Sequence, residues 1–356
     1  MKKAGKMDID LGDAAQGENP EPDHAAIRNL SGVADGRDLN GLFLCDDEGT
    51  MVRFLRYGGG DAVHEPASDI ALADLLSAAG WPVDREQPGA DAPLRRAKEM
   101  DLEGLSCDRD LRRLWFTGSH TRTAPKKDKF APPELRPNRL ALGYVVTSGA
   151  PPWRALACVE SRHAGTAVLA VLTTGILAPY ARLASKRNGP DIEGIAACGD
   201  TIYLGLRGPV IEEFAAIVRI DFVASAEATS AAPRRLAVAG SHVFLLSLDG
   251  KGVHDLAFDG DRLLILTGAM GDRQDGAALW EWSPPATSPA SGHSTVPGAD
   301  LRKLDAFKGS PKGDAPECFD ILEWDGKRRL LLVRDNPDDS RIEDGRVYRA
   351  ELFEAP

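Results

Sequence analysis

Short apolar runs recur along the chain, and turn-forming residues separate them. Four of the clearest runs lie within residues 111–118, 200–207, 259–268 and 325–334. The last three begin with an aspartate that opens a polar turn. Apolar runs of this length between polar turns are typical of β-strands rather than of helices. The pattern therefore predicts a chain built mainly of short strands joined by hairpins.

The clearest hairpin lies near the start of this pattern. Asn40-Gly41 precedes the apolar run 42–45, and the turn 46–49 separates that run from residues 51–55. Asn-Gly, and acidic residues followed by Gly, are typical of turns between antiparallel strands. Further strands are predicted within residues 140–147, 154–159, 167–172, 215–222, 243–248, 277–282 and 346–353.

Four stretches depart from the strand pattern. Residues 68–80 are the best helix candidate, because their apolar residues share one face and Gly80 can end the helix. Residues 121–138 and 283–300 contain several prolines and are predicted to be loops. Residues 1–27 are polar and without periodicity, so we expect a flexible N-terminal arm there. A single domain would then span residues 28–356.

A four-residue segment recurs five times ahead of these strands. The copies are Leu30-Ser-Gly-Val33, Leu102-Glu-Gly-Leu105, Ile192-Glu-Gly-Ile195, Val253-His-Asp-Leu256 and Pro316-Glu-Cys-Phe319. Their second positions lie 72, 90, 61 and 63 residues apart, whereas a blade of four short strands needs roughly 40–50 residues. The spacing fits single blades with long insertions.

The repeat predicts an all-β chain folded as a β-propeller. No helical pattern alternates with the strands as a parallel α/β sheet requires, and the spacing is too irregular for a solenoid. Five units are visible, and the interval 120–190 leaves room for a degenerate sixth. We therefore expect six blades, with five or seven as the alternatives.

The second position of each copy is polar. It is occupied by Ser31, Glu103, Glu193, His254 and Glu317. In a propeller these equivalent positions precede the channel-lining strands, so they converge at one mouth of the channel. Carboxylates that share a cavity need a partner charge, and Ca²⁺ or another divalent cation would provide it. The three glutamates are the predicted metal ligands.

A structural role is the alternative for the same carboxylates. A glutamate at the entry of a blade can accept hydrogen bonds from backbone N–H groups of the next blade. The histidine that replaces glutamate in one copy indicates a varied position. Within a catalytic site, His254 or His120 would be the residue that transfers protons.

A second polar set follows the runs. Ser119 and His120 follow one run, Arg207 ends the next, and Arg334 with Asp335 ends the last. Paired guanidinium groups near a cavity favour a carboxylate or phosphate ligand. We therefore predict that Ser119, both arginines and Asp335 bind the ligand, at the opposite mouth of the channel. An ion pair with a neighbouring acidic residue is the alternative for each arginine.

Charge narrows the possible partners. The 356 residues carry a formal net charge of −11, while nucleic-acid binding requires clustered Lys and Arg. No apolar stretch approaches the roughly 18 residues that a membrane helix needs. We expect a small anionic molecule or a protein as the partner, and neither nucleic acid nor a membrane.

Cysteine content and the N-terminal residues bear on the compartment. The five cysteines are scattered, which argues against a disulfide framework and a thiolate zinc site. The basic start, Met1-Lys-Lys, has no apolar segment after it, so the chain as given looks cytoplasmic. A chain from which a signal peptide had been removed would look the same.

Two of the repeat copies carry a longer motif. Asp101-Leu-Glu-Gly-Leu-Ser106 and Asp191-Ile-Glu-Gly-Ile-Ala196 resemble a segment of the esterase-like phytase propellers. Gly118-Ser-His120 is similar to an uncharacterised bacterial propeller family that has a domain of unknown function. The resemblance covers roughly residues 28–355. It implies a propeller fold and, from the phytase-like relatives, an extracellular metal-dependent phosphoesterase.

The sequence supports two hypotheses about function. In the first, a central mouth binds a small ligand, together with a divalent cation on Glu103, Glu193 and Glu317. An enzyme of this kind would be a metal-dependent hydrolase of a phosphate ester, an ester or a lactone. In the second, the propeller is a non-enzymatic scaffold for protein–protein interaction, and the loops at 121–138 and 283–300 carry the binding.

Overall fold

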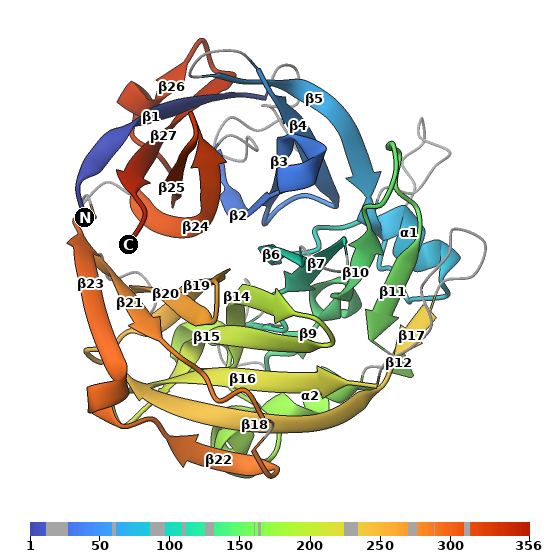
Figure 1. Cartoon of the computed structure of the whole chain (residues 1–356). Coiled ribbons are helices and arrows are strands. Elements are labelled where there is room, and N and C mark those ends of the chain that lie inside the picture. Colours follow the sequence, from blue (N-terminus) through green and yellow to red (C-terminus); the bar gives the residue numbers. More distant parts are fainter. Residues whose placement is uncertain are drawn as a thin grey trace.

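The part of the chain that the structure describes forms a ring of five four-stranded antiparallel blades (Figure 1). The innermost strands are β2 (Leu30–Asp35), β6 (Leu102–Asp108), β14 (Asp191–Cys198), β19 (Gly252–Asp259) and β24 (Ala315–Trp324). The second strands are β3 (Gly41–Asp46), β7 (Arg113–Gly118), β15 (Thr201–Ile211), β20 (Arg262–Gly268) and β25 (Lys327–Asp335). The third strands are β4 (Met51–Tyr57), β10 (Leu142–Val146), β16 (Phe214–Phe222), β21 (Ala277–Trp282) and β27 (Val347–Glu354). The outermost strands are β5 (Ala62–Ala71), β11 (Leu156–Val159), β18 (Val238–Ser247), β23 (Leu301–Phe307) and β1 (Lys3–Asp10).

The computed structural model describes most of the chain. The described residues are 1–11, 28–58, 62–85, 97–108, 112–124, 132–159, 161–162, 165–223, 234–269, 276–287, 289–309 and 314–356. The blades are numbered one to five here, beginning with the blade of β2. Among the described residues, no helix is both long enough and apolar enough to cross a membrane.

Shorter elements decorate the blades. The remaining strands are β8 (Arg122–Thr123), β9 (Glu134–Leu135), β12 (Ser161–Arg162), β13 (Gly165–Thr166), β17 (Arg234–Leu236), β22 (Gly292–Thr295) and β26 (Ile342–Glu343). The 3-10 turns are η4 (Arg37–Leu39), η5 (Pro137–Leu140), η6 (Gly175–Tyr180), η7 (Ser185–Arg187), η8 (Gly298–Asp300) and η9 (Asp339–Arg341). The helices are α1 (Leu72–Ala78) and α2 (Ala167–Leu172).

The described residues form five blades, which is the number of visible repeats, and not six. The interval 120–190 supplies β10 and β11, the outer half of blade two, instead of a blade of its own. Residues 167–172, which the apolar pattern assigned to a strand, form α2. A short apolar run fits a buried helix as well as a strand, and here Val168 and Leu172 are buried at helical spacing.

The predicted helix is shorter than its apolar pattern. Residues 68–71 belong to the end of β5, and α1 begins at Leu72. Gly80 has a φ of 79° just after the helix, as expected for a residue that ends it. Leu72, Ala73 and Leu76 form the buried face of α1.

The start of the chain is part of the fold. The sequence predicts a flexible arm over residues 1–27, but part of this segment forms β1. This strand pairs antiparallel with β27 and completes blade five. Met7, Ile9 and Leu11 are fully buried and alternate with polar residues, so a two-residue period identifies this strand. Residues 12–27, the rest of the predicted arm, lie outside the described residues.

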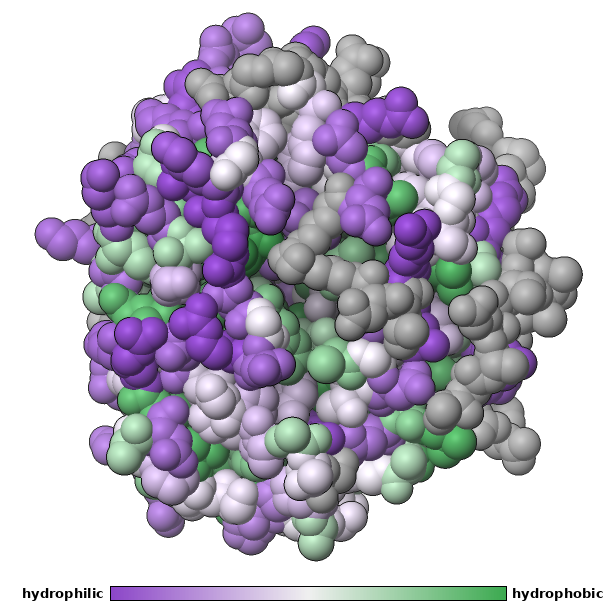
Figure 2. All heavy atoms as spheres, in the orientation of Figure 1, coloured by the Kyte–Doolittle hydropathy of each residue, from purple (hydrophilic) through white to green (hydrophobic). Residues whose placement is uncertain are grey.

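Apolar cores lie between neighbouring blades rather than within one blade. The described residues form five buried clusters, and each joins two adjacent blades around the ring. The clusters pack both faces of the inner strands, so β2 and β3 are buried along their whole length. This double burial explains why the strands are continuous apolar runs in the sequence. Hydrophilic residues cover most of the described surface in Figure 2.

Each innermost strand carries a β-bulge near its start. Its pairing with the second strand skips one residue, which is Ser31, Glu103, Glu193, His254 or Glu317. A bulge leaves one residue outside the regular pairing and redirects its side chain. The same backbone feature therefore presents all five polar residues of the repeat.

The residue after the bulge is a glycine in blades one to three, because the next blade lies too close for a side chain. A Cβ on Gly194 would lie 2.7 Å from the Cα of Asp255 in blade four. A Cβ on Gly104 would lie 3.1 Å from the backbone N of Ile195 in blade three. The Gly of the Glu-Gly pair thus allows the blades to pack closely, while the Glu is free for another role.

We expect Gly194→Ala to destabilise the protein by about 1–3 kcal/mol, because the new Cβ would overlap backbone atoms of blade four. The measurement is the free energy of unfolding in urea. Gly298→Ala is the matched control, since nothing lies within 4 Å of its added Cβ. Equal stabilities of the two variants would contradict the packing role of Gly194.

Candidate functional site at the start of the innermost strands

A cavity of about 780 Å³ lies at the end of the channel where the innermost strands begin. Four of the five bulge residues line it: Ser31, Glu103, Glu193 and Glu317. A second hollow, of about 320 Å³, is lined by residues further along the same strands, such as Phe319. The two ends of the channel therefore differ, and the polar bulge residues belong to the larger cavity.

The two predicted polar sets lie at the same end of the channel, which differs from the expectation of opposite mouths. The repeated segment is itself the innermost strand, and the apolar run after it is the second strand. These strands are antiparallel, so the end of one lies beside the start of the other. Asp191 accordingly pairs with Gly208, and Arg207 lines the same cavity as Glu193.

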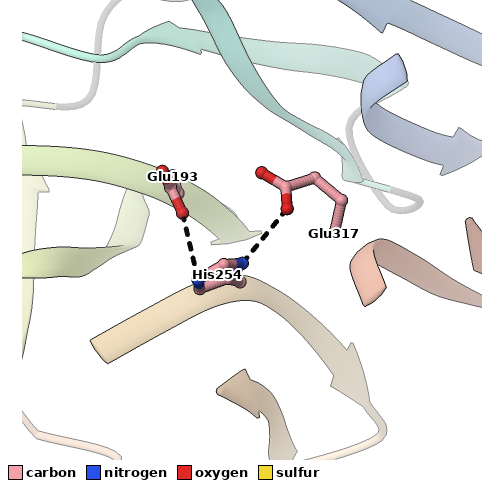
Figure 3. A group of neighbouring side chains, drawn as sticks. All are labelled: Glu193, His254 and Glu317. Carbon is pink, nitrogen blue, oxygen red and sulfur yellow. Dashed lines mark hydrogen bonds and ion pairs between the residues drawn. The ribbon is translucent and has the colours of Figure 1, made fainter. Parts of the chain in front are cut away.

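Three of the bulge residues meet in space. His254 lies between two carboxylates in Figure 3, with Nδ1 3.2 Å from Oε2 of Glu317 and Nε2 3.6 Å from Oε2 of Glu193. One ligand atom from each residue lies within 4.8 Å of the other two. The three side chains come from blades three, four and five. We call them the Glu–His–Glu cluster.

Burial and mutual charge set the protonation of this cluster. Burial alone would lower the pKa of His254, but the charges of Glu193 and Glu317 raise it to about 9. Burial raises the pKa of Glu193 to about 8, against the opposing charges of Arg207 and His254. Burial would also raise the pKa of Glu317, but the charge and hydrogen bond of His254 lower it. Without a metal, His254 is an imidazolium that neutralises its neighbours.

Glu193 has one oxygen that is paired and one that is not. Arg207 forms an ion pair with Oε1 through its Nη1. Oε2 is buried and has no hydrogen-bond partner among the described residues. Because Oε2 is the atom nearest His254, Glu193 presents an unused acceptor to the centre of the cluster. An unpaired buried carboxylate oxygen is costly in free energy, so it indicates a bound cation or proton.

Arg207 is held mainly by protein carboxylates. Its Nε and Nη2 lie 3.0 Å and 2.6 Å from Oδ2 of Asp191, and Nη2 lies 3.2 Å from the hydroxyl of Ser185. Burial would lower the pKa of Arg207, but the charges of Glu193 and Asp191 raise it. Its side chain keeps 29% of its surface exposed, so it can still face a ligand in the cavity.

The ends of the second strands form a further ring of equivalent positions. In each blade, the innermost-strand residue just before the bulge pairs with a residue of the second strand, and the next residue of that second strand is the ring position. The five positions are Asp47, Ser119, Arg207, Gly268 and Asp335. In blade four a Cβ on Gly268 would lie 2.5 Å from Nε2 of His254. A glycine is therefore required beside the imidazole. Three members of this ring were predicted from the sequence, and Asp47 and Gly268 were missed.

Arg334 lies one residue before the ring position, and this offset removes it from the cavity. Successive side chains of a strand point to opposite faces. The guanidinium of Arg334 donates from Nε to Glu351 at 2.8 Å and from Nη1 to the carbonyl oxygen of Asp314 at 2.7 Å. Its role is to join parts of blade five, and its neighbour Asp335 lines the cavity instead.

Ser119 and Asp101 belong to a network on blade two. The hydroxyl of Ser119 donates to Asp101, and Nη1 of Arg139 lies 2.6 Å from the same carboxylate oxygen. Arg139 also lies 2.6 Å from Glu99. Burial raises the pKa of Asp101 to about 6, although Arg139 and Ser119 act against it. Asp101 and Arg139 both line the cavity, so this part of its wall is neutralised by the protein.

His120 is not among the described residues that line the cavity. It is 1% exposed, and its Nδ1 donates to the carbonyl oxygen of Gly118 at 2.9 Å. Burial lowers its pKa to about 4, with a smaller opposing effect of that hydrogen bond. The imidazole is therefore neutral, and its position supports packing under the loop after β7.

Three other carboxyl groups line the cavity without an ion pair. Among the described residues, none forms an ion pair with Asp47, Glu103 or Asp335, and Oδ1 of Asp47 is buried without a hydrogen-bond partner. Burial, reinforced by Asp101, raises the pKa values of Asp47 and Glu103 well above their ordinary range. Burial and the charge of Glu317 raise the pKa of Asp335 to about 7. The cavity therefore has more carboxyl groups than the protein neutralises.

Backbone contacts between blades are made by residues other than the glutamates. The hydroxyl of Ser31 donates to the carbonyl oxygen of Leu102 in the next blade. Asp255, one residue after the bulge of blade four, accepts the backbone N–H of Phe319 at 2.8 Å. Backbone hydrogen bonding to the next blade is the alternative role that the sequence suggests for the glutamates. Ser31 and Asp255 make such contacts, whereas Glu193 contacts side chains.

Asp47 and Arg139 are cavity residues that sequence reasoning did not identify. Asp47 lies in an acidic turn and was interpreted only as hairpin chemistry. An alignment of the repeat units that included the ends of the second strands would have placed Asp47 at the position of Ser119 and Arg207. Arg139 lies in the irregular segment before β10, and no sequence pattern connects it to Asp101.

Comparison with protein families gives one match. A family described as "Protein of unknown function (DUF3616)" matches residues 29–146 and 135–350, which together cover most of the chain. A comparison with curated proteins finds no match.

Several solved structures are similar to this chain at low sequence identity. The Cps50 (Swd1) β-propeller domain of Myceliophteria thermophila is 12% identical, covers 92% of this chain and 96% of its own, and has a TM-score of 0.34. A luciferin-regenerating enzyme is 10% identical over 98% of this chain and 95% of its own, with a TM-score of 0.41. A putative 6-phosphogluconolactonase from Bacteroides uniformis is 12% identical over 89% and 64%, with a TM-score of 0.35. All three TM-scores lie below 0.5, so no conclusion about this chain is drawn from these structures.

We expect His254 of the metal-free protein to titrate with a pKa near 9, whereas His120 titrates near 4. Nitrogen-detected NMR titration of labelled histidines measures both values. Since the pKa of His254 lies above its ordinary 6.5, its stabilising charge is fully present below pH 6.5 and is lost as pH rises through 9.

Glu317→Gln tests the cause of this shift. The variant removes the closest carboxylate, so the pKa of His254 should fall, and the loss of unfolding free energy above pH 6.5 should become smaller. The pKa of His120 should not change. A value near 6.5 for His254 in the wild-type protein would refute the ion-paired cluster.

Proposed function

We propose that this chain, which belongs to the DUF3616 family, binds a divalent cation at the Glu–His–Glu cluster and hydrolyses an ester of an anionic ligand. The observation that carries the proposal is the convergence of Glu193, His254 and Glu317 on one point. The unpaired Oε2 of Glu193 faces that point. A cation there would replace the proton of His254 as the partner of two carboxylates.

The donor set favours a transition metal over Ca²⁺. Two carboxylates and one imidazole suit Zn²⁺ or Mn²⁺, whereas Ca²⁺ takes oxygen ligands. Arg207 occupies Oε1 of Glu193, which leaves Oε2 as the ligand atom. Glu103 lines the same cavity but is not part of the compact cluster, so its predicted role as a ligand is replaced by that of His254.

The basic residues of the cavity support an anionic ligand. Five of them line it: Arg122, Arg139, Lys186, Arg187 and Arg207. Lys186 and Arg187 are exposed on η7, beside blade three. We assign to them the first contact with a phosphate or carboxylate group, which is attracted by their charge. Arg207 is held by Asp191 and Glu193 and would stabilise negative charge close to the cluster.

Hydrolysis also requires a group that moves a proton near neutral pH. His254 is engaged with the cation in this proposal, and His120 does not line the cavity. Asp335 lines the cavity and has a pKa of about 7, because of burial and the charge of Glu317. A carboxyl group with this pKa can accept and return a proton at neutral pH. The bound cation would supply Lewis-acid polarisation of the scissile ester.

Metal binding is testable by calorimetric titration of the metal-free protein with Mn²⁺, Zn²⁺ and Ca²⁺. We expect one site that prefers Mn²⁺ or Zn²⁺ over Ca²⁺. Glu193→Gln combined with Glu317→Gln should lower its affinity by more than about 10-fold, because two of three ligands lose their charge. Glu281→Gln is the matched control, since its carboxylate pairs with Arg262 and Arg302 outside the cavity. Equal affinity in both variants would refute the site.

Hydrolysis is testable with p-nitrophenyl phosphate, p-nitrophenyl acetate and a simple lactone. We expect metal-dependent turnover of at least one of them. Asp335→Asn should lower kcat by about 10²–10⁴-fold and remove the limb of the pH profile near 7, with unchanged metal affinity. If the metal-loaded protein turns over none of the three, the proposed hydrolysis is contradicted for these ester classes.

A further inference from the structure

We infer that the Asp47–Glu103 wall, which is defined by these two carboxyl groups, binds an organic ammonium group of the cavity's ligand. This inference rests on the proposed function, because it assigns a second part of the ligand that the Glu–His–Glu cluster receives. Asp47 follows β3 of blade one, and Glu103 is the bulge residue of β6 in blade two. These two blades are neighbours in the ring (Figure 1).

The two carboxyl groups are unusual because the protein offers them no cation. Oδ1 of Asp47 is buried and accepts no hydrogen bond from a described residue. The carboxylate of Glu103 forms no hydrogen bond or ion pair with the described residues, although it lines the same cavity. Two unpaired acceptors that face one cavity indicate a missing donor.

The nearby cations are committed elsewhere. Arg139 lies 2.6 Å from both Glu99 and Asp101, and Arg207 pairs with Asp191 and Glu193. The divalent cation of the proposed function would be held on the opposite side of the ring, by blades three to five. Neither these two arginines nor the proposed metal therefore supplies a counter-charge at the wall.

An ammonium group fits this wall better than a second metal ion. Among the described residues, one group of three or more His, Cys, Asp or Glu ligand atoms is compact, and neither Asp47 nor Glu103 belongs to it. A metal ion at the wall would have too few protein ligands for the six or so that hard cations prefer. An alkylammonium carries three N–H donors, which two carboxylates and water can satisfy.

The cavity has room for such a ligand. Its volume of about 780 Å³ is within the range of small-molecule sites. The exposed Lys186 and Arg187 lie beside blade three, and the wall belongs to blades one and two. A ligand with an anionic group, a scissile ester and an ammonium group would match these three parts. The substrate class is thus an ester that carries both charges.

Calorimetric titration with 1,4-diaminobutane tests the inference in the Mn²⁺-loaded protein. We expect saturable binding of the diamine and none of the neutral analogue 1,4-butanediol. Glu103→Gln and Asp47→Asn should each weaken diamine binding at least 10-fold while leaving Mn²⁺ affinity unchanged. Both variants should also raise the melting temperature, because each removes a carboxyl group whose charged form the folded protein disfavours. Glu281→Gln is again the control, with no effect on either ligand.

The outcomes separate this inference from the proposed function. Binding of Mn²⁺ without binding of the diamine overturns the ammonium site and leaves the metal site standing. A second Mn²⁺ per protein that Glu103→Gln removes also overturns it, because the wall would then hold a metal ion. Loss of Mn²⁺ binding in the wild-type protein refutes the proposed function, and the ammonium site is then judged by diamine binding to the metal-free protein.

Discussion

Neighbouring innermost strands approach so closely that no side chain fits between them just after the bulge of blades one to three. Gly32, Gly104 and Gly194 meet this requirement, since an added Cβ would touch the next blade in each case. The narrow ring that results brings bulge residues of different blades within reach of one another. Glu193 and Glu317 meet His254 for this reason, although 124 positions separate the two glutamates in the sequence. Packing of glycines thus determines the electrostatics of the cavity.

Burial of several carboxyl groups around one cavity reduces the stability of the fold. The raised pKa values of Asp47, Glu103 and Glu193 show that the folded protein disfavours their charged forms. The apolar cores do not require this arrangement, because none of these three residues belongs to the five clusters that the described residues form between blades. Locally unfavourable groups that the rest of the fold maintains are typical of binding sites.

The sequence was sufficient for the propeller architecture, since the recurring segment marks every innermost strand. It was less informative about geometry. Arg207 and Arg334 looked equivalent as strand ends, but the pairing register places Arg334 one residue away and on the other face. The sixth blade was inferred from spacing, and the interval 120–190 instead extends blade two. His254 as a partner of two carboxylates, and Arg139 beside Asp101, depend on contacts between blades that no local pattern records.

The pairing of strand β1 bears on how the ring of blades closes during folding. Blade five contains β24, β25 and β27 from one end of the chain and β1 from the other. Pairings of such long sequence separation form slowly, because closing a large loop is entropically costly. Glu317 belongs to this blade, so the blade that carries one member of the Glu–His–Glu cluster is finished only when the two ends of the chain have paired. Closure of the ring thus joins the first strand of the chain to a blade that supplies part of the cavity wall.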